Sequence, residues 1–247
     1  MGVTALDVRQ VAVLGGLGVR PAHRLSGVGR RVLAYLAVRG PVAMRTMISM
    51  ELWPDLSESR GRANLRRALW QLPAGWVSSD GGELRLEAQV DLERARSAIA
   101  EAIATGRLPD GDVDLLTRDL LPGWYDEWLV GVQDQFHLGR IQALEAVSRT
   151  ARAAGDHPLA TRTALAAVCA EPLRESSVTA LVEALLAERN LFEAVRRYES
   201  YAELLGREMR AEPGPALTAL FPVFPEAPAP SAGALLARSN GHGRKHP

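Results

Sequence analysis

Apolar residues recur at helical spacing in three successive segments of the N-terminal third of the chain. These segments are residues 29–39, about 43–53 and 57–72. Gly40-Pro41 separates the first two, and Pro54-Asp55-Leu56 separates the last two. Since glycine and proline end helices, the pattern predicts two helices, a turn and a third helix. This is the order of elements in a helix-turn-helix.

Short stretches of alternating apolar residues before and after these helices predict strands. Residues 8–20 are expected to form a small antiparallel meander, with a third strand near 23–26. Residues 76–79 and 83–86 flank an Asp-Gly-Gly turn, which favours a hairpin because glycine adopts positive φ. A hairpin directly after the third helix is a wing. Residues 1–90 are therefore predicted to form an α+β winged helix-turn-helix domain.

From residue 91 onward the apolar pattern is helical. We expect helices at 91–105, 127–154, 157–170, 174–189, 191–206 and 215–221. A shift of 34 residues, the tetratricopeptide (TPR) period, relates Ala160, Ala164, Ala167 and Pro172 to Ala194, Tyr198, Tyr201 and Gly206. Residues 91–222 are therefore predicted to form an all-α, TPR-like domain that offers a concave surface to protein partners. Residues 223–247 cannot bury enough apolar surface to order themselves and are predicted to be a disordered tail.

The charge of the chain is divided unevenly between these parts. Residues 1–90 hold 12 Arg and 7 acidic residues, whereas residues 91–222 hold 14 Arg and 21 acidic residues. The tail adds three basic residues and one acid, so that the total formal charge is zero. A basic front part joined to an acidic back part is typical of a nucleic-acid reader fused to a different kind of domain.

The third predicted helix has two distinct faces, which appear when each residue is turned by 100° about the axis. Its packing face holds Gly61, Leu65, Ala68, Leu69 and Leu72, and Ser57 stands at its N-cap. The opposite face holds Arg60, Ala63, Arg66, Arg67 and Trp70, with Arg62 on the flank. Only one acid, Glu58, accompanies these arginines, so the alternating charges of an ordinary solvated face are missing.

These residues are the candidate contacts to double-stranded DNA. A cationic helix face with a small residue at its centre can enter the major groove, where arginine reaches guanine edges. Arg45 at the start of the second helix and Arg85 in the wing are candidates for additional contacts. The alternative, a solvated arginine-rich helix without a DNA role, stays open from the residues alone.

The segment 120–128 combines two leucines, a Pro-Gly turn and three aromatic residues. Trp124, Tyr125 and Trp128 are candidate interdomain residues that join the helical domain to the winged helix. The other possibility is that they close the core of the helical domain itself.

Several functional classes are not favoured by the sequence. The five histidines share no ligand spacing outside the tail, and no hydrolase or metalloprotease motif is present, so we expect no metal, cofactor or catalytic residues and no enzyme. Cys169, the single cysteine, is expected to be buried. No apolar run reaches membrane-spanning length, so that a soluble, cytoplasmic protein is expected.

Four segments taken together resemble the SARP family of bacterial pathway-specific transcriptional activators. They are Glu51-Leu52-Trp53-Pro54-Asp55, residues 62–70 (Arg-Ala-Asn-Leu-Arg-Arg-Ala-Leu-Trp), residues 120–128 (Leu-Leu-Pro-Gly-Trp-Tyr-Asp-Glu-Trp) and Glu171-Pro172-Leu173-Arg174-Glu175. The resemblance covers roughly residues 8–220. It implies an OmpR-like winged helix followed by a bacterial transcriptional activator domain.

The resemblance also implies a function. Members of the family bind direct repeats upstream of a promoter as two adjacent protomers and recruit RNA polymerase, often for a biosynthetic pathway of secondary metabolism. The chain departs from the family where Gln71 and Pro73 flank Leu72, and where Leu84 replaces an aromatic residue in the wing. The alternative hypothesis is a TPR-like protein-interaction adaptor with a degenerate winged helix.

Overall fold

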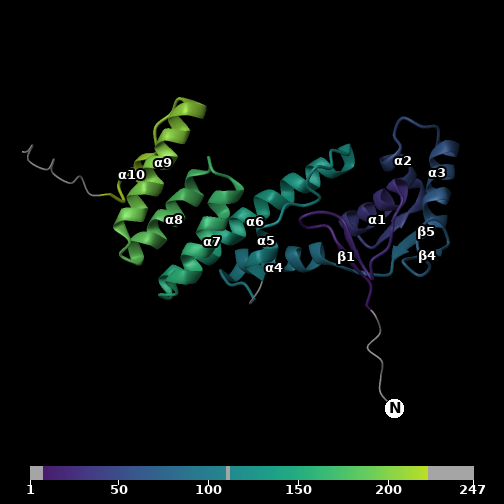
Figure 1. Ribbon diagram of the computed structural model, residues 1–247, viewed down its shortest axis with the longest axis horizontal. Helices are drawn as coiled ribbons and strands as arrows, with labels where there is room; N and C mark the ends of the chain where they lie inside the picture. Colours follow the sequence, from purple (N-terminus) through teal and green to yellow (C-terminus); the bar gives the residue numbers. More distant parts are fainter. Residues whose placement is uncertain (1–7, 110–111, 222–247) are drawn as a thin grey trace, which may run out of the picture.

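The computed structural model describes residues 8–109 and 112–221, so the predicted tail at 223–247 lies outside the described residues. Figure 1 shows an elongated arrangement, with the small sheets and first three helices at one end and α7 to α10 at the other. Helix α6 (Glu127–Ala153) runs between the two ends. The predicted order of a winged helix followed by an all-α part is confirmed.

The first sheet contains β1 (Gln10–Ala12), β2 (Gly18–Arg20) and β6 (Gln89–Val90) in the order β2-β1-β6. Strands β1 and β2 are antiparallel as predicted, whereas β6 is parallel to β1. The expected third strand near residues 23–26 is therefore wrong. That segment leads into a helix instead, because the Ser26 hydroxyl accepts a hydrogen bond of 3.1 Å from the amide of Gly29 and caps it.

The helix-turn-helix consists of α1 (Gly27–Arg39), α2 (Arg45–Leu52) and α3 (Glu58–Trp70). The second helix begins later than predicted, since Val42–Met44 form β3. Strand β3 pairs with β5 (Glu83–Leu86), and this pairing places residues 42–44 in a strand where local sequence favoured a helix.

The predicted wing is present as β4 (Val77–Asp80) and β5, in a sheet of order β3-β5-β4. Asp80 pairs with Glu83, so Gly81 and Gly82 form the two-residue turn, with φ of 55° and 111°. Only glycine adopts both angles without strain, which explains why the turn contains two glycines.

The remaining helices are α4 (Asp91–Thr105), α5 (Asp112–Leu116), α7 (His157–Ala170), α8 (Glu175–Ala187), α9 (Leu191–Met209) and α10 (Pro215–Thr218). From α6 to α9 each helix packs on the next, and α6 also contacts α8. Ala160, Ala164, Ala167 and Ala194 of the predicted repeat are fully buried, which allows the helices to approach closely. Cys169, however, is exposed, so the expected buried thiol is wrong.

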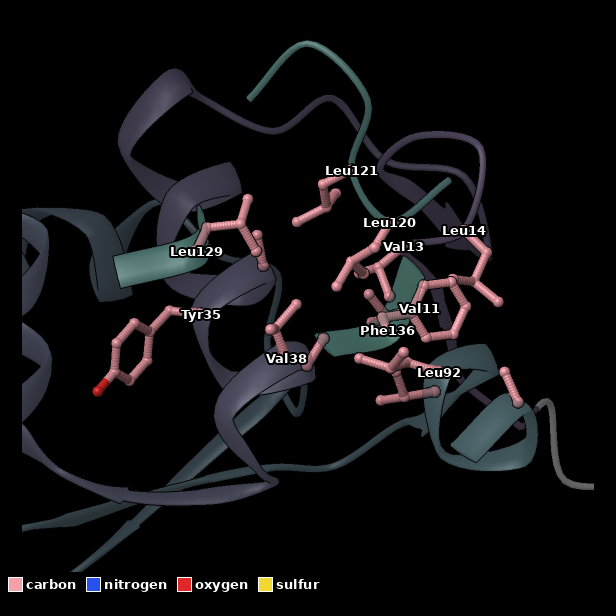
Figure 2. Packing of buried hydrophobic residues seen from close by; sticks show 14 of the residues in the cluster. Val11, Val13, Leu14, Tyr35, Val38, Leu92, Leu120, Leu121, Leu129 and Phe136 are labelled. Carbon is pink, nitrogen blue, oxygen red and sulfur yellow. The ribbon is translucent and has the colours of Figure 1, made fainter. Parts of the chain in front are cut away.

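A single hydrophobic core joins the winged helix to the first helices of the all-α part. Figure 2 shows its centre, where residues of β1 and the segment after it lie among side chains of α4, α6 and residues 120–121. The core residues labelled there are Val11, Val13, Leu14, Tyr35, Val38, Leu92, Leu120, Leu121, Leu129 and Phe136. The predicted boundary at residue 90 thus does not separate two cores.

Asp91, the first residue of α4, strengthens this junction. Its carboxylate accepts hydrogen bonds from the amides of Val13 (2.8 Å) and Leu14 (3.2 Å). Burial raises the pKa of Asp91 above its ordinary value, although these amides favour the charged form. The side chain therefore replaces a strand partner for two amides that the short β1 leaves unpaired.

Within the described residues, no helix is long and apolar enough to cross a membrane.

Candidate nucleic-acid interface

Helix α3 is fixed in place by the small and apolar residues of its inner face. Gly61, Leu65 and Ala68 are buried, and Leu69 is half-buried. A Cβ added at Gly61 would lie 3.3 Å from the backbone oxygen of Ser49, so glycine permits the close packing of α3 on α2. The predicted packing face is the face that meets the core.

The opposite face of α3 carries the arginines, and all of them reach the surface. Its exposed residues are Arg60, Arg62, Ala63, Arg66, Arg67 and Trp70. Arg62 forms an ion pair with Glu58, one turn earlier. Among the described residues, Arg60, Arg66 and Arg67 form no ion pair with an acid. Their guanidinium groups are therefore available to an external anion.

Trp70 is the most exposed large apolar side chain of this face, with 89% of its surface accessible. It ends α3, after which Gln71 serves as the C-cap. The indole ring of Trp70 therefore offers a large apolar surface beside the arginines of α3.

Arg45 is the first residue of α2, which packs against α3, and Arg85 lies on β5 of the wing. The guanidinium of Arg45 donates a hydrogen bond of 2.9 Å to the Ser79 hydroxyl in the wing, and its amide donates to the Gly82 carbonyl at 3.0 Å. Arg85 is exposed on β5 between the buried Leu84 and Leu86, so it points away from the core. Figure 1 shows α2, α3 and the β4-β5 hairpin at the same end of the molecule.

The segment 120–128 packs directly against the winged helix. The Leu121 amide donates to the Val13 carbonyl (2.8 Å), and the Gly15 amide donates to the Asp119 carbonyl (2.7 Å). Leu121 has a φ of 43°, a strained conformation for a bulky residue that persists only where the surroundings hold it. The Gln133 side chain helps to hold it, since its amide nitrogen donates to the carbonyls of Leu120 (2.9 Å) and Leu121 (3.2 Å).

The three candidate interdomain aromatics behave differently. Trp128 is 7% exposed and lies against Tyr35 of α1, with ring centroids 5.1 Å apart. Trp124 is half-buried, and its carbonyl lies 3.4 Å from the Gln133 amide nitrogen. Tyr125 is 88% exposed and takes no part in this packing, so its predicted role is wrong. Gly123 has a φ of 80° in the turn before these residues, and the side chains that pack after it are those of Trp124 and Trp128.

Two ion pairs of α1, one at this junction and one within the helix-turn-helix, were not predicted. Arg31 of α1 forms an ion pair with Asp126, the N-cap residue of α6. Arg39 of α1 forms a second ion pair with Glu51 of α2 (2.9 Å). Burial, followed by the charge of Glu51, raises the pKa of Tyr35 to about 12. Tyr35 of α1 thus lies near both Trp128 of α6 and Glu51 of α2. Helical periodicity does not show which element covers Tyr35.

The described residues contain no group of three or more His, Cys, Asp or Glu that could hold a metal ion.

Comparison with known proteins agrees with this architecture. Residues 111–222 match the family described as "Bacterial transcriptional activator domain". The structure is similar to that of Mycobacterium tuberculosis EmbR in complex with a low-affinity phosphopeptide, with a TM-score of 0.57 and 21% sequence identity. That match covers 86% of this chain, which spans 63% of the length of the EmbR chain. No curated protein matches the sequence.

A winged helix precedes an all-α part, and the family match covers that part from residue 111 onward. Residues 111–222 therefore carry a bacterial transcriptional activator domain. The order of the two parts is that of EmbR, in agreement with the SARP resemblance found in the sequence. At 21% identity, the likeness to EmbR shows a shared fold.

A pair of substitutions tests the junction. Trp128→Ala removes a buried aromatic from the shared core and is expected to lower the free energy of unfolding by about 3–5 kcal/mol. Tyr125→Ala removes an aromatic of similar size, three residues away, that is exposed, and should change stability by less than about 0.5 kcal/mol. Guanidinium denaturation followed by circular dichroism measures both. Equal effects would contradict the assigned packing.

Proposed function

We propose that the chain binds specific double-stranded DNA sequences through α3 and activates transcription from a nearby promoter. The observation that carries the proposal is the exposed face of α3, on which Arg60, Arg66 and Arg67 have no acidic partner among the described residues. Arginine at this position can neutralise phosphates or form paired hydrogen bonds with guanine. Arg45 and Arg85, which both lie at the β3-β5-β4 sheet, are proposed to extend the cationic surface.

The helical part has a different task in this proposal. Residues 91–222 carry a net charge of −7, which disfavours DNA as their partner. We propose that they contact RNA polymerase and a second protomer bound at a direct repeat upstream of the promoter. A biosynthetic pathway is the proposed target of regulation. The shared hydrophobic core at the junction supports this division, because it would hold a recruited partner in a fixed orientation to the DNA.

The alternative function is a TPR-like adaptor whose winged helix does not bind DNA. Its support is that α3 ends at Trp70, soon followed by Pro73, and that Leu84 of the wing is buried and cannot touch a ligand. DNA binding by the full chain distinguishes the two functions.

Salt dependence gives the first test. If Arg45, Arg60, Arg66, Arg67 and Arg85 all contact phosphate, the logarithm of the binding constant should fall with the logarithm of salt concentration with a slope of about −4 to −5 per protomer. Fluorescence anisotropy with labelled duplexes from the chain's own upstream region measures this slope. A flat dependence would favour the adaptor.

Two classes of arginine should behave differently when substituted. Arg66→Ala or Arg67→Ala removes a contact to base edges and should cost about 1–3 kcal/mol, with relaxed preference at one base pair. Arg45→Ala should weaken binding to all sequences about equally, since contacts at a helix start are to phosphate. Binding selections from random duplexes for each variant measure sequence preference. If Arg45→Ala alone changed the sequence preference, α3 would lie in a different orientation on the DNA from the one proposed.

A further inference from the structure

The position of Trp70 on α3 adds a specific role to the proposed DNA interface. At 100° per residue, Trp70 stands about 20° from Ala63 around the helix axis and about 180° from the centre of the buried face. The buried face is formed by Gly61, Leu65 and Ala68. Trp70 is therefore among the residues that point most directly away from the core. Around the helix axis, Trp70 lies at the centre of the exposed face, and along the axis it lies at the C-terminal end of α3.

The arginines lie on both sides of this central line. Arg66 is turned about 40° from Trp70 in one direction and Arg67 about 60° in the other. Ala63 and Trp70 thus form an apolar line along the exposed face, with a cationic side chain on each flank. The small Ala63, about 10 Å nearer the start of the helix, lets the backbone approach closely. The two ends of the line therefore differ in how far they project.

This arrangement matches the chemistry of the major groove. Phosphates line its two walls, and arginines on the flanks of a helix can reach them or the guanine edges beside them. The groove floor presents hydrogen-bonding groups on every base pair, but its one apolar group is the 5-methyl of thymine. An indole ring has a large apolar surface that would be buried against that methyl group.

Resting on the proposed DNA binding, we infer that Trp70 is a specificity-determining residue that contacts the 5-methyl group of a thymine in the recognised sequence. The contact covers a side chain that is otherwise 89% exposed. It adds a preference for A·T at one or two positions to the preference for G·C that arginine forks supply.

Removal of single methyl groups tests the inference. A duplex is first selected from a random pool by the full chain, and each thymine is then replaced in turn by uracil, which lacks only the methyl group. Dissociation constants are measured by anisotropy for the wild-type chain and for Trp70→Ala. For the wild type, uracil at one or two positions should weaken binding about fourfold, the effect of one buried methyl group. Trp70→Ala should itself weaken binding roughly tenfold and lose this dependence on the methyl group.

Two further variants make the result specific. Trp70→Phe should retain the sensitivity to uracil, because an aromatic face remains. Phe192→Ala removes another aromatic that is 80% exposed, from α9 in the helical part, and should change neither affinity nor methyl dependence. Thermal unfolding of each variant should match that of the wild type, since these side chains are exposed.

The outcomes separate this inference from the proposed function. If the full chain binds DNA but uracil weakens binding equally in the wild type and in Trp70→Ala, Trp70 does not read thymine, and DNA binding itself stands. If no duplex is enriched and binding is insensitive to salt, DNA binding fails, and the role of Trp70 fails with it.

Discussion

The packing of residues 119–128 and α6 against β1 and α1 is the contact on which the rest of the structure depends. Strand β1 has three residues, and its neighbours β2 and β6 are equally short or shorter. So small a sheet has little apolar surface of its own to bury. Leu120, Leu121 and Phe136 of the helical part cover it, and Asp91 binds the amides that follow it. The winged helix therefore completes its core with residues from outside it.

This junction also connects the two parts of the chain to which we assign different roles. Trp128 packs on Tyr35, and Glu51, beside Tyr35, pairs with Arg39, so contacts run from α6 through α1 to α2. Helix α3 packs on both α1 and α2. A partner bound to α6 would thus act on the helix-turn-helix through packed side chains. A packed connection of this kind fits the proposed function, in which the DNA-bound part presents the helical part in one orientation.

The periodicity of apolar residues was sufficient to predict much of the fold. The predicted helices at 91–105 and 157–170 have the observed bounds of α4 and α7, and the inner face of α3 follows from its 100° pattern. Pairings between distant residues could not be predicted in the same way. Strand β6 is two residues long and pairs with a strand nearly eighty residues earlier. Strand β3 forms in a sequence that favours a helix, because it pairs with β5.

Sequence periodicity also could not predict which way some single side chains face. An apolar helix stretch suggested a buried Cys169, and an aromatic cluster suggested a buried Tyr125, yet both face outward because the turns and neighbours that orient them are set by tertiary packing. For the candidate DNA contacts, sequence reasoning places Arg60, Arg66, Arg67 and Trp70 on one face, and the structure leaves that face open. Which bases or phosphates they touch stays a prediction, because it depends on a partner.

The winged helix and the helical part share one core, and a chain ending at Val90 tests this most directly. Without residues 91–247, the apolar side chains of Val11, Val13, Leu14 and Val38 lose their cover. We expect this shortened chain to show no cooperative unfolding transition in guanidinium, whereas the full chain unfolds cooperatively. A shortened chain that unfolds cooperatively, with the stability of the N-terminal part unchanged, would show that the winged helix does not depend on the shared core.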